Sequence, residues 1–418
     1  MNQLQGFVQY VNKVFNLPSL AKAVTDGRPW PQIPTTCVWL SLFFGSLMRV
    51  PSFLQLEAET RRRCWQRWIG WKAPISDDTF GYVAEQMSLD DLRHSLLQTN
   101  KILKENKAFE GNKINGLLIA TVDGNEEFCS QSRCCESCCK RQRHCKDAQG
   151  KEYEVTEYYH KQVYCQLIGK HLNVILDLEA QRPGEDEVAA TLRLLGRVRR
   201  LYGVRFFDVL AVDAGFIEGP FLTAVERLGW AVVSVLKQER YEVWKESENL
   251  TRNKAPTQKF LQEKREVQLW DVKDLPFTET YQGNVRVVRS EEQWIQIKHK
   301  GQKRIEVPMH QKWRWVATNG LDGYEPKVIW QIGHLRWRIE NNAFNELTQH
   351  WNLEHCSHHH PQAIIVLLLI KVLAFNLFKA FAQLHGKLWR IAKITFQELR
   401  LQLYRALELD CVILFFSG

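Results

Sequence analysis

The chain has 418 residues, a mass of 49.0 kDa, a net charge of +9 and a pI of about 8.9. Its 45% hydrophobic and 25% charged residues are typical of a globular protein with a sizeable buried core, and they exclude an intrinsically disordered chain. The positive net charge favours polyanionic partners, nucleic acid first.

The N-terminal stretch MNQLQGFVQYVNKVF has no basic segment followed by an apolar one, so no secretion signal is expected. The most apolar run, AIIVLLLI at residues 363–370, is shorter than a bilayer span and suits a buried helix. Without an export signal, the 11 cysteines are expected to be reduced thiols or metal ligands. We therefore expect a soluble, cytoplasmic protein with no membrane partner.

Five segments differ in their hydrophobic pattern. Residues 1–112 have helical patterns and form a possible DNA-binding region, and residues 113–237 alternate short apolar runs with helical stripes. Residues 238–330 contain short β-type runs separated by turn residues. Residues 331–360 contain a helix that returns to the core, and residues 361–418 form a helical, strongly apolar tail. The sequence therefore predicts an α/β fold with a β-rich insertion and helical ends.

The core segment predicts three strands, then a helix, a strand, a helix and a last strand. The first strand, in GLLIATVDGNEEF, is expected to stop at the turn Asp123–Gly124, and residues 161–169 and 171–181 form the next two. Short links suit antiparallel neighbours, whereas helical crossovers imply that the later strands are parallel. A mixed sheet is therefore expected.

Three carboxylates are expected to meet at one edge of this sheet. Asp123 ends the first strand and Asp213 ends the fourth, and α/β proteins place their sites beyond the carboxyl ends of strands. Glu340, in LRWRIENNAFNE, lies on the helix after the insertion. Like charges repel unless a cation joins them, and hard oxygen ligands suit Mg²⁺ or Mn²⁺, acting as a pair in phosphoryl transfer. Asp177 and Asp208 lie inside strands, where a structural role is expected.

In their order and context, VDG at Asp123, VDAGF at Asp213 and RWRIENNAFNEL at Glu340 resemble the DDE motifs of bacterial insertion-sequence transposases. The resemblance is closest to the group with a β-rich insertion before the glutamate. That group's signature is Tyr, two residues, Arg, three residues, Glu, six residues, Lys. Arg336 and Glu340 match it, whereas Gly333 and Leu347 replace the tyrosine and the lysine.

The resemblance implies a ribonuclease-H-like core whose three acids bind two metal ions. It also implies cleavage at the ends of an element, joining of the 3′ hydroxyls to target DNA, terminal inverted repeats as substrate and a homodimer on DNA. Two alternatives are a structure-specific nuclease on the same fold and a catalytically silent DNA-binding descendant.

Arg336 and Glu340 are four residues apart, so on a regular helix they share a face. Arg336 is then expected to contact a phosphate while Glu340 binds metal, and Arg338 is also expected at the DNA. The alternative is an internal Arg–Glu pair worth a few tenths of a kcal/mol.

Two aromatic stretches interleave tryptophans with cationic residues. RRRCWQRWIGWK, residues 61–72, is expected either to contact DNA or to form a solvated helix face anchored by its tryptophans. In the insertion, Trp313 and Trp315 should share one strand face, opposite Arg314. The DNA-contact hypothesis for the first stretch names Arg61, Arg62, Arg63, Trp65 and Arg67.

The stretch CSQSRCCESCCKRQRHC, residues 129–145, contains six cysteines in an expected loop. Cys135 and Cys138 have the Cys-x-x-Cys spacing of a structural zinc site, and the alternative is a group of reduced thiols. HWNLEHCSHHHP, residues 350–361, is expected to supply metal ligands or to form a partly exposed helix end. Candidates for the remaining zinc ligands are Cys134, Cys139, Cys145, His144 and His160, or the distant His355, Cys356 and His358.

Overall fold

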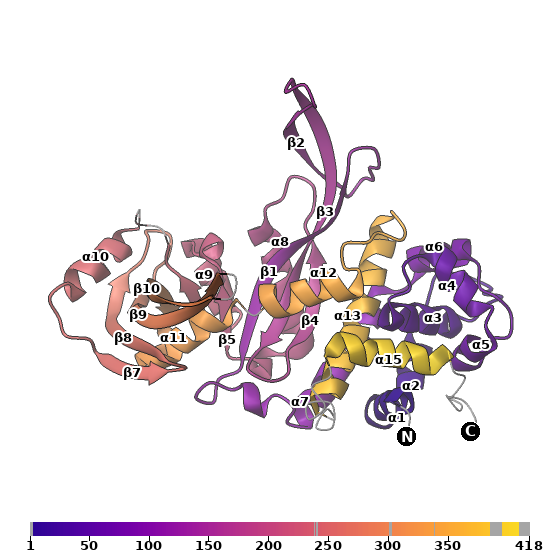
Figure 1. Cartoon of the computed structure of the whole chain (residues 1–418), viewed down its shortest axis with the longest axis horizontal. Coiled ribbons are helices and arrows are strands. Elements are labelled where there is room, and N and C mark those ends of the chain that lie inside the picture. Colours follow the sequence, from indigo (N-terminus) through magenta and orange to yellow (C-terminus); the bar gives the residue numbers. More distant parts are fainter. Residues whose placement is uncertain are drawn as a thin grey trace.

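The structure, a computed structural model, describes residues 3–237, 239, 241–300, 303–337, 339–384 and 395–408. Figure 1 shows helices from both ends of the chain on one side, a central sheet, and a second group of strands on the other side. The expected α/β fold with a mixed sheet is confirmed.

The N-terminal part is helical because serine caps and apolar faces recur along it. Ser52, Ser76 and Ser88 each accept a backbone N–H from three residues later, which satisfies a free donor at the helix start. The helices are α1 (Gln3–Phe15), α2 (Leu17–Ala23), α3 (Thr35–Met48), α4 (Phe53–Thr60), α5 (Arg63–Ile69), α6 (Asp77–Gln86) and α7 (Leu89–Glu105), followed by the 3₁₀ turn Glu110–Asn112.

Apart from one additional strand, β2, the elements of the core sheet follow the expected order. Its elements are β1 (Ile119–Ser130), β2 (Cys139–Lys146), β3 (Glu152–Ile168), β4 (Val174–Ala180), α8 (Glu187–Tyr202), β5 (Val209–Val212), α9 (Gly219–Arg227) and β6 (Ala231–Val235). The strands lie in the order β4-β3-β1-β5-β6, with β3 antiparallel to its neighbours and β1, β5 and β6 parallel. This is the ribonuclease-H-like arrangement, with short links between antiparallel strands and helices between parallel ones. Two 3₁₀ turns, Val204–Phe206 and Ala214–Phe216, flank β5.

Two expectations for this segment were wrong. β1 does not stop at Asp123–Gly124, because the long β3 continues to pair with it as far as Ser130. Gly124 lies within the strand, next to the flexible ends of the Lys161 and Glu187 side chains. The expected cysteine loop also contains strand β2, which pairs with the outer half of β3.

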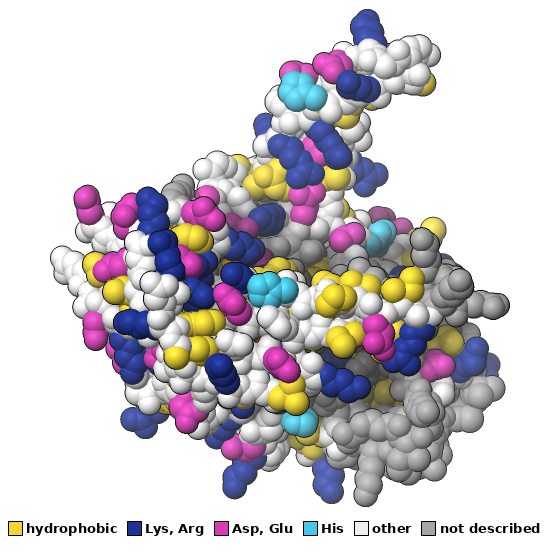
Figure 2. Space-filling view, turned by 60° about the vertical axis from the view of Figure 1, so that its left-hand side comes forward, with side chains coloured by type: hydrophobic (Ala, Val, Ile, Leu, Met, Phe, Trp, Pro, Cys, Tyr) yellow, Lys and Arg dark blue, Asp and Glu magenta, His cyan; other side chains and the backbone are white. Residues whose placement is uncertain are grey.

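β2 and β3 form a ribbon that projects from the body (Figures 1 and 2). Basic and acidic side chains lie side by side on it (Figure 2). Arg141 and Arg143 both pair with Glu157, and Lys146 pairs with Glu152. These ion pairs offset much of the positive charge of β2.

The insertion continues the core sheet. It contains α10 (Glu242–Thr251), β7 (Gln258–Gln262), β8 (Arg265–Pro276), β9 (Asn284–Lys300) and β10 (Lys303–Thr318), then the 3₁₀ turn Asn319–Leu321. β10 pairs with β6, so all ten strands belong to one sheet. Four of the expected short runs are in fact two long strands, β9 and β10, because their cross-strand pairing runs unbroken through the polar residues between the runs.

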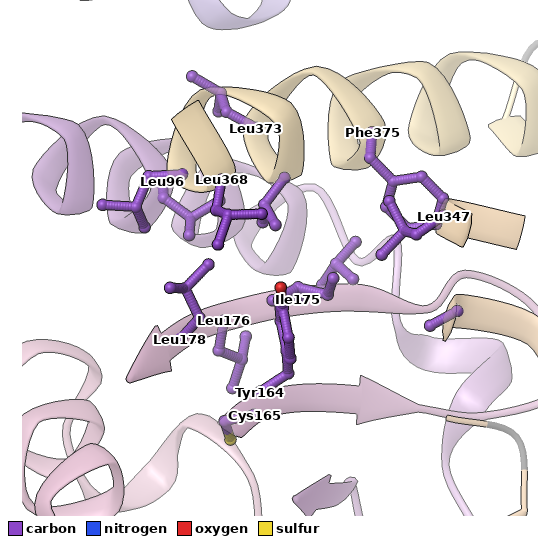
Figure 3. Packing of buried hydrophobic residues seen from close by; sticks show 14 of the residues in the cluster. Leu96, Tyr164, Cys165, Ile175, Leu176, Leu178, Leu347, Leu368, Leu373 and Phe375 are labelled. Atoms are coloured by element: carbon purple, nitrogen blue, oxygen red, sulfur yellow. The ribbon is translucent and has the colours of Figure 1, made fainter. Parts of the chain in front are cut away.

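Helices follow the insertion: α11 (Pro326–Leu335), a π-helical turn (Ile339–Phe344), α12 (Asn345–Trp351), α13 (Pro361–Leu384) and α15 (Phe396–Glu408). By length and composition α13 would suffice to cross a membrane, but most of it is buried inside the protein. It contacts α3, α6, α7 and β4, which confirms the expected buried helix. Figure 3 shows Leu368 of α13 beside Leu96 of α7, both above β4.

A buried carboxylate attaches α11 to the insertion. Glu292 of β9 accepts hydrogen bonds from Trp330 (2.8 Å) and from Arg265 (2.5 Å), and it lies 2.9 Å from Nε2 of His334. Burial opposes its charge, but His334, Trp330 and Arg265 outweigh burial and lower the pKa of Glu292 to about 2. The end of α11 is thereby held on β9.

Glu292→Gln should lower the free energy of unfolding at pH 7 by about 3 kcal/mol. The folded-state pKa lies below the unfolded one, so this stability is present above about pH 4.5 and is lost as the pH falls towards about 2. Denaturant unfolding at pH 7 and pH 3 measures it, with the exposed Glu306→Gln as control. Equal pH dependence in wild type and Glu292→Gln would contradict this assignment.

Candidate active site

Asp123 and Asp213 lie level with each other on neighbouring strands. β1 and β5 pair in parallel with Thr121 opposite Ala211, so two residues further along Asp123 stands beside Asp213. Residues two apart on a strand face the same side, and neighbouring strands lie about 4.8 Å apart. The two carboxylates therefore project from one face, beyond the last β1–β5 pairs.

The Arg336 guanidinium lies between these carboxylates. Its Nη1 is 3.6 Å from Oδ2 of Asp123, and its Nη2 is 3.9 Å from Oδ1 of Asp213. Arg336 is only 3% exposed and lies over the Trp337 ring, with 4.4 Å between its Cζ and the ring centroid. From the sequence, Arg336 was expected to contact a DNA phosphate. In the structure it contacts the two predicted catalytic acids, Asp123 and Asp213.

Lys237 is a site residue that the sequence reasoning missed. Its Nζ lies 3.2 Å from Oδ1 of Asp213 and 5.6 Å from the centroid of Trp337. It follows β6, the strand beside β5, so its place at the same sheet edge was a usable signal. Nearly half of its side chain is exposed, so it can also meet a ligand from solvent.

The charges around Asp213 keep it ionised. Burial would raise its pKa, but the Ala214 backbone N–H, Arg336 and Lys237 together lower the pKa of Asp213 below its ordinary value. Gly124 also donates its backbone N–H to Oδ1 of Asp123, at 2.9 Å. The site thus offers hard, charged oxygen atoms, a donor set that fits Mg²⁺ or Mn²⁺.

Glu340 lies on a backbone segment that contacts β1. The π-helical turn Ile339–Phe344 contains it, and this turn packs against the strand that carries Asp123. The side chain of Glu340 and the whole of Arg338 lie outside the described residues. The expectation of a regular helix through Arg336 and Glu340 was wrong, because α11 ends at Leu335 and a π turn follows. Such turns are frequent at functional sites.

Gly333 and Leu347, which replace the tyrosine and the lysine of the family signature, both lie where the protein packs tightly. A Cβ on Gly333 would lie 2.1 Å from Nε1 of Trp315, so no tyrosine fits where α11 crosses β10. Leu347 is fully buried, and Figure 3 shows it against Phe375 of α13. Neither position is available for contact with a DNA end.

Residues 61–72 separate into buried tryptophans and surface arginines. Trp65 is fully buried beside Trp68, so it anchors the helix, and the expectation that Trp65 contacts DNA was wrong. Arg61 pairs with Glu57, and Arg62 pairs with Glu59 at 2.8 Å. Arg63 and Arg67 are exposed, and their contact with DNA stays a prediction.

The structure agrees with what was expected of the Trp313–Trp315 stretch and of two further aspartates. Trp313 and Trp315 stack on one face of β10, while Arg314 lies over Trp244 on the other. Asp177 is buried against Arg197 at 2.6 Å, and Asp208 accepts the Leu118 backbone N–H at 2.8 Å. Both aspartates therefore have structural partners, although Asp208 precedes β5 instead of lying within it.

A second cluster joins Cys135, Cys138, His160 and His359, whose ligand atoms all lie within 4.8 Å of one another. His160 was a named candidate, but His359 was not. His358, one of the distant alternatives, lies with its Nε2 2.6 Å from Oε1 of Glu85. Burial and the nearby His359 lower the pKa of His160 to about 4, so its ring is neutral at pH 7.

The strand order is that of the ribonuclease-H-like fold, which includes enzymes of nucleic-acid phosphoryl transfer. The family model described as transposase DDE domain matches residues 132–377, more than half of the chain. That range contains Asp213 and Glu340 and begins after Asp123. The chain belongs to this family.

Membership makes the chain a DNA transposase, an enzyme that cleaves and joins DNA strands and depends on divalent metal ions. No curated protein sequence matches it. Among solved structures it is similar to a piggyBac transposase synaptic complex with hairpin DNA, with a TM-score of 0.42 and 11% identity, over 97% of this chain and 80% of that chain.

Proposed function

We propose that Asp123, Asp213 and Glu340 hold Mg²⁺ or Mn²⁺, and that the chain uses this site to cut the 3′ ends of an insertion sequence and join them to target DNA. The observation that carries the proposal is the level placement of Asp123 and Asp213 about the buried Arg336. When bound, two such ions activate the attacking oxygen and stabilise the leaving oxygen of an in-line displacement.

The chain's own residues prepare this site in two ways. Arg336 neutralises part of the repulsion between the two aspartates and keeps both on one face. Lys237 and Trp337 lie beside them, and the exposed part of Lys237 offers a cation to the DNA phosphate next to the scissile bond. Arg338 is proposed as a further phosphate contact, in line with its place between Trp337 and the π turn.

The proposed substrates are the terminal inverted repeats of the element and a target duplex, bound by a homodimer because two ends must be joined together. The net charge of +9 supports binding to a polyanion. We also propose a cytoplasmic location. The ten cysteines described in the structure all carry free thiols, which supports a reducing compartment.

A strand-transfer assay tests this function. Labelled DNA carrying the inverted repeats that flank the gene is incubated with purified protein, a plasmid target and Mg²⁺. We expect a nick at the 3′ end of the repeat and a branched product joined to the plasmid. Both products should disappear with EDTA and with Asp213→Asn.

The rival functions give other products. A structure-specific nuclease would cut the labelled DNA and never join it, even when the substrate carries a pre-cut 3′ end. A silent descendant would shift the DNA in a gel and leave both strands intact. Either outcome, with protein that is folded by circular dichroism, would overturn the proposed strand transfer.

A further inference from the structure

Four side chains from three separate parts of the chain meet at the base of the projecting ribbon. Cys135 and Cys138 lie in the turn between β1 and β2, His160 lies in β3, and His359 lies two residues before α13. Cys138 and His160 are buried, and the other two are half-buried. These four residues belong neither to the acid site, which is formed by Asp123, Asp213 and Glu340, nor to the proposed DNA contacts.

Four of the distances between these ligand atoms match those around a tetrahedral zinc ion. Zinc bonds of about 2.3 Å to sulfur and about 2.0 Å to nitrogen separate two sulfur ligands by about 3.8 Å, and a sulfur from a nitrogen by about 3.5 Å. The two sulfur atoms here lie 3.7 Å apart. Nε2 of His160 lies 3.3 Å from Sγ of Cys135 and 3.2 Å from Sγ of Cys138, and Nε2 of His359 lies 3.4 Å from Sγ of Cys138.

The surrounding backbone and rings hold the four atoms in place. The Cys138 N–H donates to the Cys135 carbonyl and the Cys135 N–H donates to Sγ of Cys138, each at 3.2 Å, which closes a tight turn around the thiols. Phe128 stacks on His160 with 5.1 Å between ring centroids and meets His359 edge-on at 5.3 Å, so both rings are fixed.

A disulfide does not account for this geometry, because its sulfur atoms would lie about 2.05 Å apart and both cysteines are free thiols. Sulfur–histidine hydrogen bonds alone would satisfy pairs of atoms, but they give no reason for all four to converge. Two thiolates and two imidazoles are a ligand set of structural zinc.

We propose that Cys135, Cys138, His160 and His359 bind one zinc ion that fastens the β1–β2 turn and β3 to the start of α13. Four protein ligands leave no open position, so the ion is structural and takes no part in DNA chemistry. His359 follows the π turn and α12, so the ion also anchors the segment after Glu340 to the strand pair that carries Asp123.

The zinc content of the full-length protein tests the proposal. The protein is purified without chelator, and its zinc is measured by elemental mass spectrometry. We expect about one zinc ion per chain in the wild type and close to none in Cys135→Ser/Cys138→Ser. His359→Ala should lose most of the zinc. The matched neighbours Cys134→Ser and His358→Ala should keep it, because Cys134 is exposed and His358 points to Glu85.

If a variant fails to fold, two further measurements decide whether these four residues bind zinc. Wild-type protein loaded with Co²⁺ should show the visible bands of a tetrahedral ion and the charge-transfer absorption of thiolate ligands. Cys135→His, which retains a ligand atom, should keep zinc where Cys135→Ser loses it. Folded wild-type protein without zinc would overturn the proposal, as would Co²⁺ without thiolate bands or equal zinc in His359→Ala and His358→Ala.

This test is separate from the proposed transposition chemistry. Asp213→Asn should abolish strand transfer and keep its zinc, because Asp213 contributes no ligand to the cluster. A failure of the strand-transfer assay with zinc present would count against the acid site alone, and absence of zinc in an active enzyme would count against the zinc site alone.

Discussion

Asp123→Asn and Asp213→Asn should each reduce DNA cleavage by about 10³-fold or more, because a divalent ion contributes several kcal/mol of transition-state stabilisation. An amide keeps the shape of the carboxylate and removes its charge. Each variant should therefore stay folded, since Gly124 can still donate to an amide oxygen at position 123. Single-turnover cleavage of labelled inverted-repeat DNA measures the effect.

Asp208→Asn is the matched control for these variants. Asp208 lies five residues before Asp213 and accepts the Leu118 backbone N–H, a bond that an asparagine oxygen can also accept. We expect it to cleave at the wild-type rate. Wild-type cleavage by Asp123→Asn or by Asp213→Asn would remove that residue from the catalytic site.

Arg336→Ala should lower the free energy of unfolding by about 2 kcal/mol and abolish most of the cleavage activity. The guanidinium is 3% exposed and faces Asp123 and Asp213, so its loss leaves two like charges on adjacent strands. A residue that only contacts a DNA phosphate would weaken DNA binding or cleavage without a loss of stability. The burial of Arg336 adds the cost in stability, which is moderate because Asp213 is 38% exposed.

Mg²⁺ distinguishes the role of the charge from that of packing. The ion replaces the missing positive charge, so it should stabilise Arg336→Ala more than the wild type in denaturant unfolding. Arg336→Lys keeps the charge and should retain most of the stability, although it loses the forked geometry. If Mg²⁺ stabilised all three proteins equally, the guanidinium would not be the counter-charge of the two acids.

The sequence predicted those parts of the fold that depend on local pattern and chain order. Buried apolar runs separated by helical stripes indicated the parallel strands β5 and β6, and Asp213 was placed at a strand end because its run stops there. Strand alternation also separated Trp313 and Trp315 from Arg314. These features follow from short-range periodicity.

The features that the sequence missed depend on partners distant along the chain. β1 continues past Asp123 because β3 is long enough to pair with it, although Asp-Gly is a turn signal by itself. For Trp65 the sequence left two alternatives open, and burial in the helical N-terminal part decides for the tryptophan that anchors a helix face. His359 approaches Cys138 across more than two hundred positions, and only the fold selects it over His358.

Iron-mediated cleavage of the polypeptide tests the shared metal site most directly. Fe²⁺ bound in place of Mg²⁺, with ascorbate and peroxide, generates radicals that cut the backbone beside the ligands. Fragments mapped by mass spectrometry should end next to Asp123, Asp213 and Glu340, and excess Mg²⁺ should suppress all three cuts together. Missing cuts at any one of these residues, or cuts that Mg²⁺ leaves unchanged, would contradict a single site built from the three acids.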